Sequence, residues 1–483
     1  GAARVVGEEH PELWGGLVDF DPISDVSLDA DRFARHLAAS DGEDQIAFRG
    51  SRRYVLRLMP ASGEQKAETF AWRPDGAYLI SGGLGDIGLR VAGELAAHGV
   101  RRLILVGRTP LPSREQWNET DPESKIGRRV AAVQALEAQG LSVHIATIDV
   151  SDEEQLREFL HRYKADAWPP IRGVIHAAGT LDDQLASSLS RADFDALLGP
   201  KLRGAQHLDR LLPDLDLFVL VSSIGAFMPQ PGQANYAAAN AALDAIAHDR
   251  CGRGLPALSI GWGVWENTGL VKGETGQRNV IELARRGIGT LSVERGAKIF
   301  AWLCSRRESH VTVLPIDWNK FRRTRAGRNS PIFKDVWKDA PATDTPAPKL
   351  KGRLAIAGVS ERRQLLDGAV RSAVGKVLKI SPSRIDPRKT LGAMGLNSLM
   401  AMELRNRLEA ELERPLSATL AWNYPTVEVL VAYLADTSPA LAAAEIKELR
   451  LDTSKSIQAV IDLSDEQALA ALRAHGSARG TRQ

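Results

Sequence analysis

The chain has 483 residues, of which 44% are hydrophobic, so it is long enough to bury the cores of about two or three domains. Its 62 Lys and Arg residues nearly balance its 60 Asp and Glu residues, so the charge pattern gives no indication of a nucleic-acid or membrane surface. Two cysteines exclude a disulfide framework, and no apolar run approaches the roughly 20 residues of a membrane span or forms a signal-peptide core, so we expect a soluble, cytoplasmic protein with no nucleic-acid or membrane partner.

The beginning of the chain carries strand-like pieces and no chemical motif. From Ala77 onward, short apolar strands alternate with helices. We predict strands at 77–81, 103–106, 143–148, 173–176, 217–221 and 257–261, and helices at 88–99, 126–140, 191–198 and 236–253. A capping box of Ser151 and Glu154 predicts the start of one more helix. This alternation indicates a doubly wound parallel sheet of the Rossmann-like α/β class, and strands that are apolar throughout fit a sheet covered on both faces.

A linker and a small helical bundle follow the sheet. Residues 339–350 are rich in Pro, Ala and Thr, which predicts a linker. Apolar residues at helical spacing then predict a small all-α bundle, and the polar tail contains one short helical stretch at 465–474. The predicted segments are a first segment at 1–71, an α/β domain at 72–330, a linker at 331–359, a helical bundle at 360–436 and a tail at 437–483.

A glycine-rich loop joins the first strand of the α/β domain to its first helix. The loop has the pattern G-x-G-x-x-G, and the residues expected to bind a cofactor are Gly83, Leu84, Gly85, Ile87 and Gly88. Glycine lets the backbone approach a pyrophosphate, and the helix N-terminus offers free N–H groups. The alternative is a tight turn with a structural role only.

The ends of the later strands indicate which nucleotide binds. The second strand ends in Gly107-Arg108, with no carboxylate to bind the ribose 2′-hydroxyl of NAD, and a cation suits a 2′-phosphate. We therefore predict NADPH, with Arg108 at the phosphate; the alternative is a solvated loop charge. Asp149 and Val150, after the third strand, are placed to hold the adenine edge. The small residues Ala177 and Gly179, after the fourth strand, leave room for the nicotinamide.

A serine, a tyrosine and an asparagine follow the fifth strand at regular spacing. Ser223 lies 13 residues before Tyr236, and Asn240 lies one helical turn after Tyr236, on the same helix face. These residues resemble the short-chain dehydrogenase/reductase superfamily, and specifically the ketoreductases of bacterial modular type I polyketide synthases, over about residues 72–330. Most short-chain dehydrogenases have a lysine where this chain has Asn240. Polyketide ketoreductases place that lysine earlier, where Lys201 stands.

The resemblance implies the reduction of a ketone by NADPH. Tyr236 would give a proton to the developing alkoxide, and because a phenol has a pKa of about 10, the Lys201 ammonium would favour its ionised form and hold the nicotinamide ribose. Ser223 would hydrogen-bond the carbonyl oxygen, as an oxyanion donor does. Asn240 would anchor the water chain that resupplies protons.

The residues after the fourth strand also resemble a stereochemical marker of the family. Leu181-Asp182-Asp183 matches the LDD motif of B-type ketoreductases, which give the D-configured β-hydroxyl; an ordinary acidic loop is the alternative. Ala238 stands where epimerising variants have proline, so we expect no epimerisation.

The helical bundle resembles an acyl carrier domain. Ser398, in the sequence Gly395-Leu-Asn-Ser-Leu-Met400, matches the serine that carries 4′-phosphopantetheine. Asn397 replaces the usual aspartate; asparagine still caps a helix but lacks the negative charge that a phosphopantetheinyl transferase would recognise. A tethered arm would raise the local concentration of substrate at the reductase.

The remaining segments resemble parts of a larger synthase. Residues 11–19 resemble the later part of the structural subdomain that precedes polyketide ketoreductases, so 1–71 is interpreted as a partial subdomain. The expected partners are other domains of the same module and, through the tail at 437–483, a downstream module; a frayed chain end is the alternative for the tail. A second hypothesis is a silent reductase that serves as a carrier and scaffold. A third, a free-standing dehydrogenase for sterols or sugars, does not explain Ser398.

Overall fold

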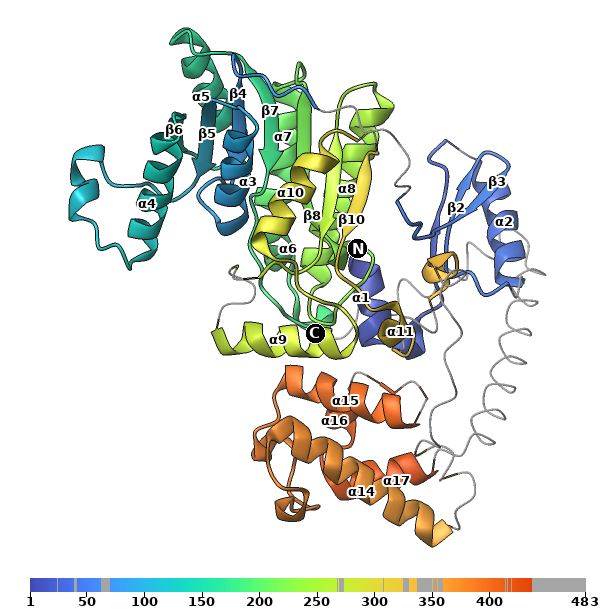
Figure 1. Cartoon of the computed structure of the whole chain (residues 1–483). Helices are drawn as coiled ribbons and strands as arrows, with labels where there is room; N and C mark the ends of the chain where they lie inside the picture. Colours follow the sequence, from blue (N-terminus) through green and yellow to red (C-terminus); the bar gives the residue numbers. More distant parts are fainter. Residues whose placement is uncertain are drawn as a thin grey trace, which may run out of the picture. The chain divides into compact units, whose positions relative to one another are not determined.

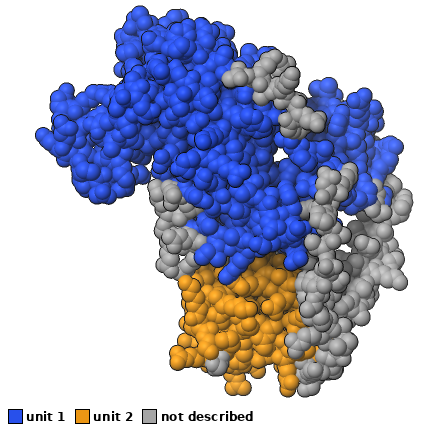
Figure 2. All heavy atoms as spheres, in the orientation of Figure 1, with its two compact units in different colours: residues 1–345 blue, residues 346–483 orange. Residues whose placement is uncertain are grey.

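The computed structural model divides the chain into two compact units, residues 1–345 and 346–483, which Figure 2 shows in different colours. The described residues are 1–23, 25–38, 41–61, 70–266, 268, 273–306, 308–324, 330–336, 350, 354, 359–412, 414, 416–417 and 419–436. Most of the predicted linker and the whole tail, with its expected helix at 465–474, lie outside the described residues. Within the described ranges, no helix combines the length and the apolar character needed to span a bilayer.

Seven parallel strands form the main sheet in the described part of unit 1 (Figure 1). Their spatial order is β10 (His310–Val313), β9 (Leu258–Trp262), β8 (Leu217–Ser223), β7 (Ile171–His176), β4 (Ala77–Ser81), β5 (Arg102–Gly107) and β6 (Ser142–Thr147). The winding direction reverses between β4 and β7, and open α/β sheets bind ligands in the crevice at the carboxyl ends of the strands there. The predicted doubly wound α/β fold is confirmed.

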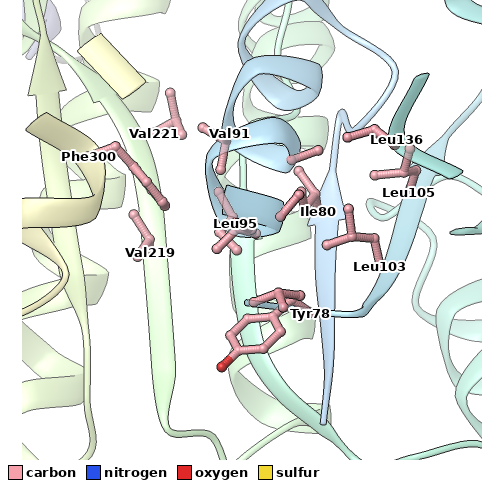
Figure 3. Packing of buried hydrophobic residues seen from close by; sticks show 14 of the residues in the cluster. Tyr78, Ile80, Val91, Leu95, Leu103, Leu105, Leu136, Val219, Val221 and Phe300 are labelled. Carbon is pink, nitrogen blue, oxygen red and sulfur yellow. The ribbon is translucent and has the colours of Figure 1, made fainter. Parts of the chain in front are cut away.

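Successive side chains along a strand point to opposite faces of the sheet, and each face is covered by its own group of helices. Tyr78 and Ile80 on β4 belong to one buried cluster, whereas Leu79 between them belongs to the other. The first cluster includes side chains of α3 (Asp86–Ala97), α4 (Lys125–Ala138) and α10 (Val293–Leu303), and Figure 3 shows part of it around Leu95 and Phe300. The second includes side chains of α5 (Glu153–Ala165), α7 (Gly204–Leu211) and α8 (Ala234–Gly252).

The connecting segments of unit 1 contain shorter elements. These are the 3-10 helices η2 (Arg114–Glu119), η3 (Ala186–Ser188), η5 (Ile224–Ala226) and η6 (Pro331–Phe333), the π-helix η4 (Gly199–Arg203), and the helices α6 (Arg191–Leu198), α9 (Gly273–Arg285) and α11 (Trp318–Phe321). The turn η6 falls within the range predicted as linker. Its Ile332 and Phe333 are nevertheless buried against Phe321, so packed structure continues into the predicted linker range.

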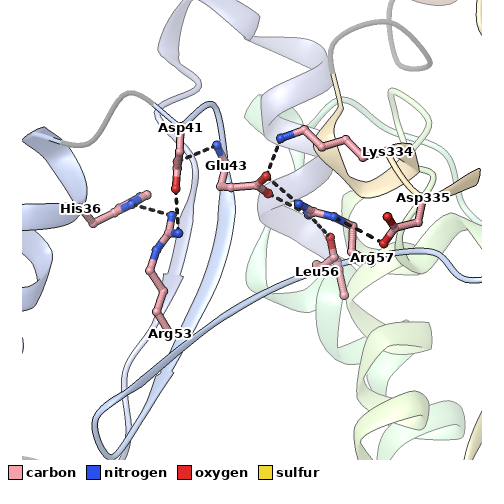
Figure 4. Close-up of polar contacts among 8 residues, drawn as sticks. All are labelled: His36, Asp41, Glu43, Arg53, Leu56, Arg57, Lys334 and Asp335. Carbon is pink, nitrogen blue, oxygen red and sulfur yellow. Dashed lines mark hydrogen bonds and ion pairs between the residues drawn. The ribbon is translucent and has the colours of Figure 1, made fainter. Parts of the chain in front are cut away.

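The first 60 residues form a small sheet that is tied to the end of unit 1. The elements are α1 (Ala2–Glu9), η1 (Pro11–Leu13), β1 (Leu17–Asp19), α2 (Val26–Ala38), β2 (Gln45–Arg49) and β3 (Arg52–Val55), with sheet order β1-β2-β3. The Glu43 carboxylate accepts two hydrogen bonds from Arg57, at 2.7 and 2.6 Å, and is also paired with Lys334 (Figure 4). These contacts fix the N-terminal subdomain to residues that follow the main sheet.

The described part of unit 2 is a helical bundle, as predicted. It contains α14 (Val359–Leu378), η8 (Pro382–Arg384), η9 (Gly392–Met394), α15 (Ser398–Leu412), α16 (Leu420–Asn423) and α17 (Val427–Asp436). Val370 and Val374 of α14, Leu404 and Leu408 of α15 and Leu430 of α17 are fully buried in one core. Because burial of such side chains provides most of the stability of a small bundle, this helical spacing explains why the segment folds compactly.

Candidate active site

The glycine loop lies between β4 and α3, at the switch point of the sheet, and its shape depends on the missing side chains. A Cβ atom on Gly83 would lie 2.7 Å from the Ile80 carbonyl oxygen, and one on Gly88 would lie 2.4 Å from the Gly82 carbonyl oxygen. Gly82 itself has a φ of +68°, which only glycine adopts easily. Gly85 caps the helix, whose first N–H groups face the crevice end of the sheet. The loop therefore fits the pyrophosphate of a dinucleotide, because its backbone is open to close approach.

The other residues of the loop have supporting positions. Leu84 is buried, and its carbonyl oxygen accepts a hydrogen bond of 3.1 Å from Arg129 Nε on α4. Ile87 is partly buried against the first core cluster. Their side chains therefore hold the loop on the sheet, and a nucleotide would contact their backbone.

Arg108 and Asp149 lie near each other beyond the ends of β5 and β6. Arg108 Nη1 is 4.0 Å from Asp149 Oδ2, and 59% of the Arg108 side chain is exposed. Asp149 Oδ1 accepts hydrogen bonds from the N–H and hydroxyl of Ser151. Val150 is buried with its side chain against Gly204 in the second core cluster, so only its backbone could face an adenine.

A buried histidine holds the segment that carries Lys201. His176, at the end of β7, is fully buried, and its Nε2 lies 2.9 Å from the Lys201 carbonyl oxygen. Burial lowers the pKa of His176 to about 4, so the ring is neutral. Because a carbonyl oxygen only accepts, Nε2 carries the proton, and Nδ1 accepts from the Ser81 hydroxyl at 2.6 Å. Lys201 lies in the π-helix η4, a form often found at functional sites.

Lys201, Asn240 and Tyr236 come together at the carboxyl end of the sheet. Lys201 is 6% exposed, and its ammonium donates hydrogen bonds to Asn240 Oδ1 at 2.9 Å and to the Val221 carbonyl oxygen at 3.1 Å. Asn240 Nδ2 in turn donates to the Tyr236 carbonyl oxygen at 2.8 Å. Lys201 Nζ lies 5.6 Å from the centre of the Tyr236 ring. The asparagine therefore links lysine to tyrosine.

The charges of this cluster are set mainly by burial. Burial lowers the pKa of Lys201 to about 8, against the opposing effect of Asp244, so the ammonium still forms at neutral pH. Burial also raises the pKa of Tyr236, although hydrogen bonds with Ser223 and Asn240 act in the other direction. The sequence led us to expect a phenol made more acidic by lysine. In the structure burial is the largest effect on the pKa of this phenol and raises it, and the acidifying effect of the lysine stays a prediction.

Ser223 and Asp183 of the motif at 181–183 both interact with Tyr236. Ser223 ends β8, and its hydroxyl accepts a hydrogen bond of 3.2 Å from the N–H of Gly225 and interacts with the Tyr236 hydroxyl. Leu181 is partly buried, whereas Asp182 and Asp183 are exposed. Asp183 accepts a hydrogen bond of 3.2 Å from Gln233, three residues before Tyr236.

Two small residues after β7 leave room beside Lys201. The Ala177 N–H donates to the Ser81 carbonyl oxygen at 2.9 Å, which ties this loop to the glycine loop. A Cβ atom on Gly179 would lie 2.7 Å from Cε of Lys201, so the lysine side chain runs directly over this glycine. Any larger residue would displace the lysine.

Sequence reasoning missed two of these supports. His176 is the last residue of the strand predicted at 173–176, with no role assigned to its side chain, and Gly82 precedes the G-x-G-x-x-G pattern. A polar residue in an otherwise apolar strand was the available signal for His176. The contact with Lys201 is between residues 25 positions apart, which no spacing rule indicates.

In unit 2, Asn397 begins the helix that carries the predicted attachment serine. The Asn397 side chain accepts a hydrogen bond of 2.9 Å from the N–H of Met400, which is an N-cap contact. The backbone of Ser398 opens α15, and its side chain lies outside what the structure describes.

Comparisons with known proteins match both units. The family model described as KR domain matches residues 76–267, and the one described as phosphopantetheine attachment site matches residues 368–434. The 6-methylsalicylic acid synthase of Aspergillus terreus is 35% identical over 455 residues, which cover 90% of this chain and 24% of that protein. This chain therefore spans about a quarter of that relative's length.

Two solved ketoreductases are similar to unit 1. The ketoreductase from the first module of phoslactomycin biosynthesis in a Streptomyces species is 33% identical, with a TM-score of 0.60 over 70% of this chain and 75% of that one. An A-type ketoreductase from a modular polyketide synthase is 32% identical, with a TM-score of 0.58 over 70% of this chain and 68% of that one. The chain therefore belongs to the ketoreductases of polyketide synthases, NAD(P)H-dependent enzymes that reduce β-ketoacyl groups, and it also carries a phosphopantetheine carrier domain.

Proposed function

We propose that unit 1 reduces a β-ketoacyl thioester carried on Ser398 to the D-β-hydroxyacyl thioester, with NADPH and without epimerisation. The observation that carries this proposal is the buried group of Lys201, Asn240 and Tyr236 beside a glycine loop open to a dinucleotide. The nicotinamide, when bound, supplies a hydride, and the protein must then supply a proton and a charge for the developing alkoxide.

Tyr236 is the proposed proton donor. Its raised pKa keeps the phenol protonated before reaction, as a donor requires. Ser223, which already interacts with the Tyr236 hydroxyl, would hold the ketone oxygen next to that hydroxyl. Both groups then act on the same oxygen atom, where the negative charge develops.

Lys201 and Asn240 are proposed to assist the proton transfer from Tyr236. Two of the three ammonium hydrogens of Lys201 are used by Asn240 and Val221, and the third is left for the nicotinamide ribose. The charged ammonium, 5.6 Å from the tyrosine ring centre, would stabilise the phenolate that follows proton transfer. The Asn240 side-chain oxygen, which accepts from Lys201, retains one lone pair for the proposed water chain.

NADPH is proposed over NADH on the chemistry around Arg108. Its guanidinium is largely exposed and lies 4.0 Å from the Asp149 carboxylate, a long contact that leaves it able to reach a 2′-phosphate. The glycine loop would hold the pyrophosphate, and Gly179 and Ala177 would border the nicotinamide.

The D configuration is proposed from the motif at 181–183. The hydrogen bond between Asp183 and Gln233 supports a role for this loop at the substrate entrance. Similar solved ketoreductases include A-type enzymes, so overall likeness does not choose between configurations.

The carrier and its partners complete the proposal. A phosphopantetheinyl transferase would modify Ser398 at the start of α15, and the chain would work as a segment of a larger cytoplasmic synthase. Its partners would be other domains of the module and, through residues 437–483, a downstream module. The carrier domain makes a free-standing sterol or sugar dehydrogenase a poor alternative.

We expect Tyr236→Phe to lower kcat by about 10²- to 10⁴-fold, because it removes the proton donor. The assay follows NADPH oxidation with a β-ketoacyl N-acetylcysteamine thioester, and chiral chromatography of the wild-type product should give mainly the D alcohol. Tyr163→Phe is the matched control, since that hydroxyl donates to the Pro169 carbonyl oxygen, on elements outside the catalytic group. Wild-type turnover in the Tyr236→Phe variant would contradict the role of Tyr236. A mainly L product would contradict the proposed configuration. An inactive wild-type protein would favour the hypothesis of a silent reductase that serves as a scaffold.

The stability of the protein should depend on pH through Lys201. Its pKa is about 8 in the folded protein and 10.5 in the unfolded chain, so between these pH values the unfolded state binds the extra proton. Folding stability should therefore rise with pH in this window, relative to Lys201→Met, by up to about 3 kcal/mol. Thermal melting of both proteins at pH 7 and pH 10 measures this difference. A difference that stays constant over this range would contradict the buried ammonium, and the exposed Lys164→Met is the control for the substitution itself.

Arg108→Ala should weaken NADPH and leave NADH unaffected. Loss of a charged hydrogen bond to phosphate should raise the KM for NADPH by roughly 10- to 100-fold. Steady-state kinetics with both nucleotides measures the effect, with the exposed Arg162→Ala as control. Equal changes for NADPH and NADH would show that Arg108 does not distinguish the 2′-phosphate.

Ser398→Ala should abolish modification of the carrier domain. Incubation with coenzyme A and a phosphopantetheinyl transferase should add one phosphopantetheine to the wild type, as intact mass shows, and none to the variant. Asn397→Asp should accelerate the addition, because it restores a negative charge beside the serine. Ser381→Ala serves as the control, and modification of the Ser398→Ala variant would place the arm elsewhere.

A further inference from the structure

Two loops close in sequence to the proposed catalytic residues are hydrogen-bonded to each other. One loop, 177–185, follows β7 and contains the motif at 181–183; the other, 229–233, leads directly to Tyr236 on α8. The Gln184 N–H donates to the Gly232 carbonyl oxygen at 2.8 Å, and the Gln233 side chain donates to Asp183 at 3.2 Å. Because Gly232 has a φ of +86°, the second loop depends on a backbone form that other residues adopt poorly.

The carboxylate of Glu9, in the N-terminal subdomain, connects the second loop to Ala186, the residue that directly follows the first loop. Its Oε1 accepts a hydrogen bond from the Gly232 N–H at 2.8 Å, and its Oε2 accepts one from the Ala186 N–H at 2.9 Å. We call this pair of contacts the Glu9 bridge. Glu9 is 1% exposed, and a buried carboxylate is stable only when hydrogen-bond donors surround it. Separation of the loops would remove these donors, so the carboxylate resists it.

The helix that carries Glu9 is itself fixed to the catalytic helix. α1 packs against α8 (Figure 1), and Val5 of α1 is fully buried with Ala234 and Ala237, the neighbours of Tyr236. Arg4 Nη1 also donates to the Ala226 carbonyl oxygen at 2.7 Å. The helix that carries the Glu9 bridge is therefore packed against α8, the helix that carries Tyr236.

We propose that Glu9 is a positioning residue for stereochemical control. It holds the loop with Asp182 and Asp183 at a set distance from the loop before Tyr236, and so determines which face of the ketone is presented. The proposal rests on the proposed function of Tyr236 as proton donor, and it does not depend on which alcohol is the main product.

The test is Glu9→Gln, which keeps the size of the side chain and turns an amide N–H₂ toward one of the two N–H donors. The substrate is a β-ketoacyl N-acetylcysteamine thioester with NADPH, and the readout is the ratio of the two alcohols on a chiral column. We expect the minor alcohol to increase roughly tenfold relative to the major one, since one charged hydrogen bond is lost. The Kd for NADPH should stay within about twofold of wild type, because the glycine loop lies on other elements.

Glu8→Gln is the matched control. It makes the same change on the same helix, and the side chain lies about 100° around the helix axis from Glu9. This variant should keep the wild-type ratio. A purely structural role of Glu9 would lower the melting temperature and leave the alcohol ratio unchanged, and that result would overturn the proposal.

Ala186→Pro tests the same bridge if Glu9→Gln does not fold. Ala186 opens η3, and Leu185 before it has φ −59° and ψ 145°, which a following proline accepts. Proline has no backbone N–H, so the hydrogen bond that the Glu9 carboxylate accepts from residue 186 is lost. The proline ring would also occupy the space of the carboxylate and push it away. The alcohol ratio should shift as with Glu9→Gln, and an unchanged ratio would overturn the proposal. An absence of wild-type turnover would instead reject the proposed function, and this inference with it.

Discussion

The proposed active site depends on one buried ammonium. Lys201 is almost completely removed from water, and a lysine in such a place is stable only when acceptors surround it. Asn240 and the Val221 carbonyl oxygen provide two acceptors, and His176 holds the backbone of the lysine from the other side. The burial that makes the ammonium costly also leaves it poorly screened by water, and its Nζ lies 5.6 Å from the centre of the Tyr236 ring.

This arrangement supports our proposal that Lys201 takes the role of the lysine that most short-chain dehydrogenases carry one turn after the tyrosine. A lysine one turn after Tyr236 would reach the site from α8 itself, whereas Lys201 reaches it from the π-helix η4. The side-chain amide of Asn240 accepts a hydrogen bond from the lysine and donates one to the Tyr236 carbonyl oxygen, so it connects the two residues. Gly179 completes the exchange, since any side chain there would occupy the path of Lys201.

The fold could be predicted well from the sequence because its strands and helices follow local patterns of apolar residues. The apolar run at 77–81 matches β4, and the predicted helix at 126–140 differs from α4 by two residues or fewer at either end. The short edge strand β10 was not predicted, because four partly buried residues show no clear apolar run. In the first segment strand-like pieces were expected and the strands β2 and β3 are present, whereas the contact with Lys334 is distant in sequence and could not be predicted.

Most contacts within the site could not be predicted, because they also join residues that are distant in sequence. Tyr236 and Asn240 are related by helical spacing, so their common face could be predicted. The raised pKa of Tyr236 could not, because burial is a property of the folded chain. The bridge from Glu9 joins residues more than 170 positions apart, and no motif marks either end.

The most direct test of the account is the titration of Lys201 itself. NMR of protein labelled with carbon-13 at the lysine ε-carbon, with Lys201→Met to assign the signal, reports the protonation of this amine alone. We expect a midpoint near pH 8, well below the ordinary value of 10.5. A midpoint at the ordinary value would mean that the amine is in water, and the buried ammonium beside Tyr236 would have to be abandoned.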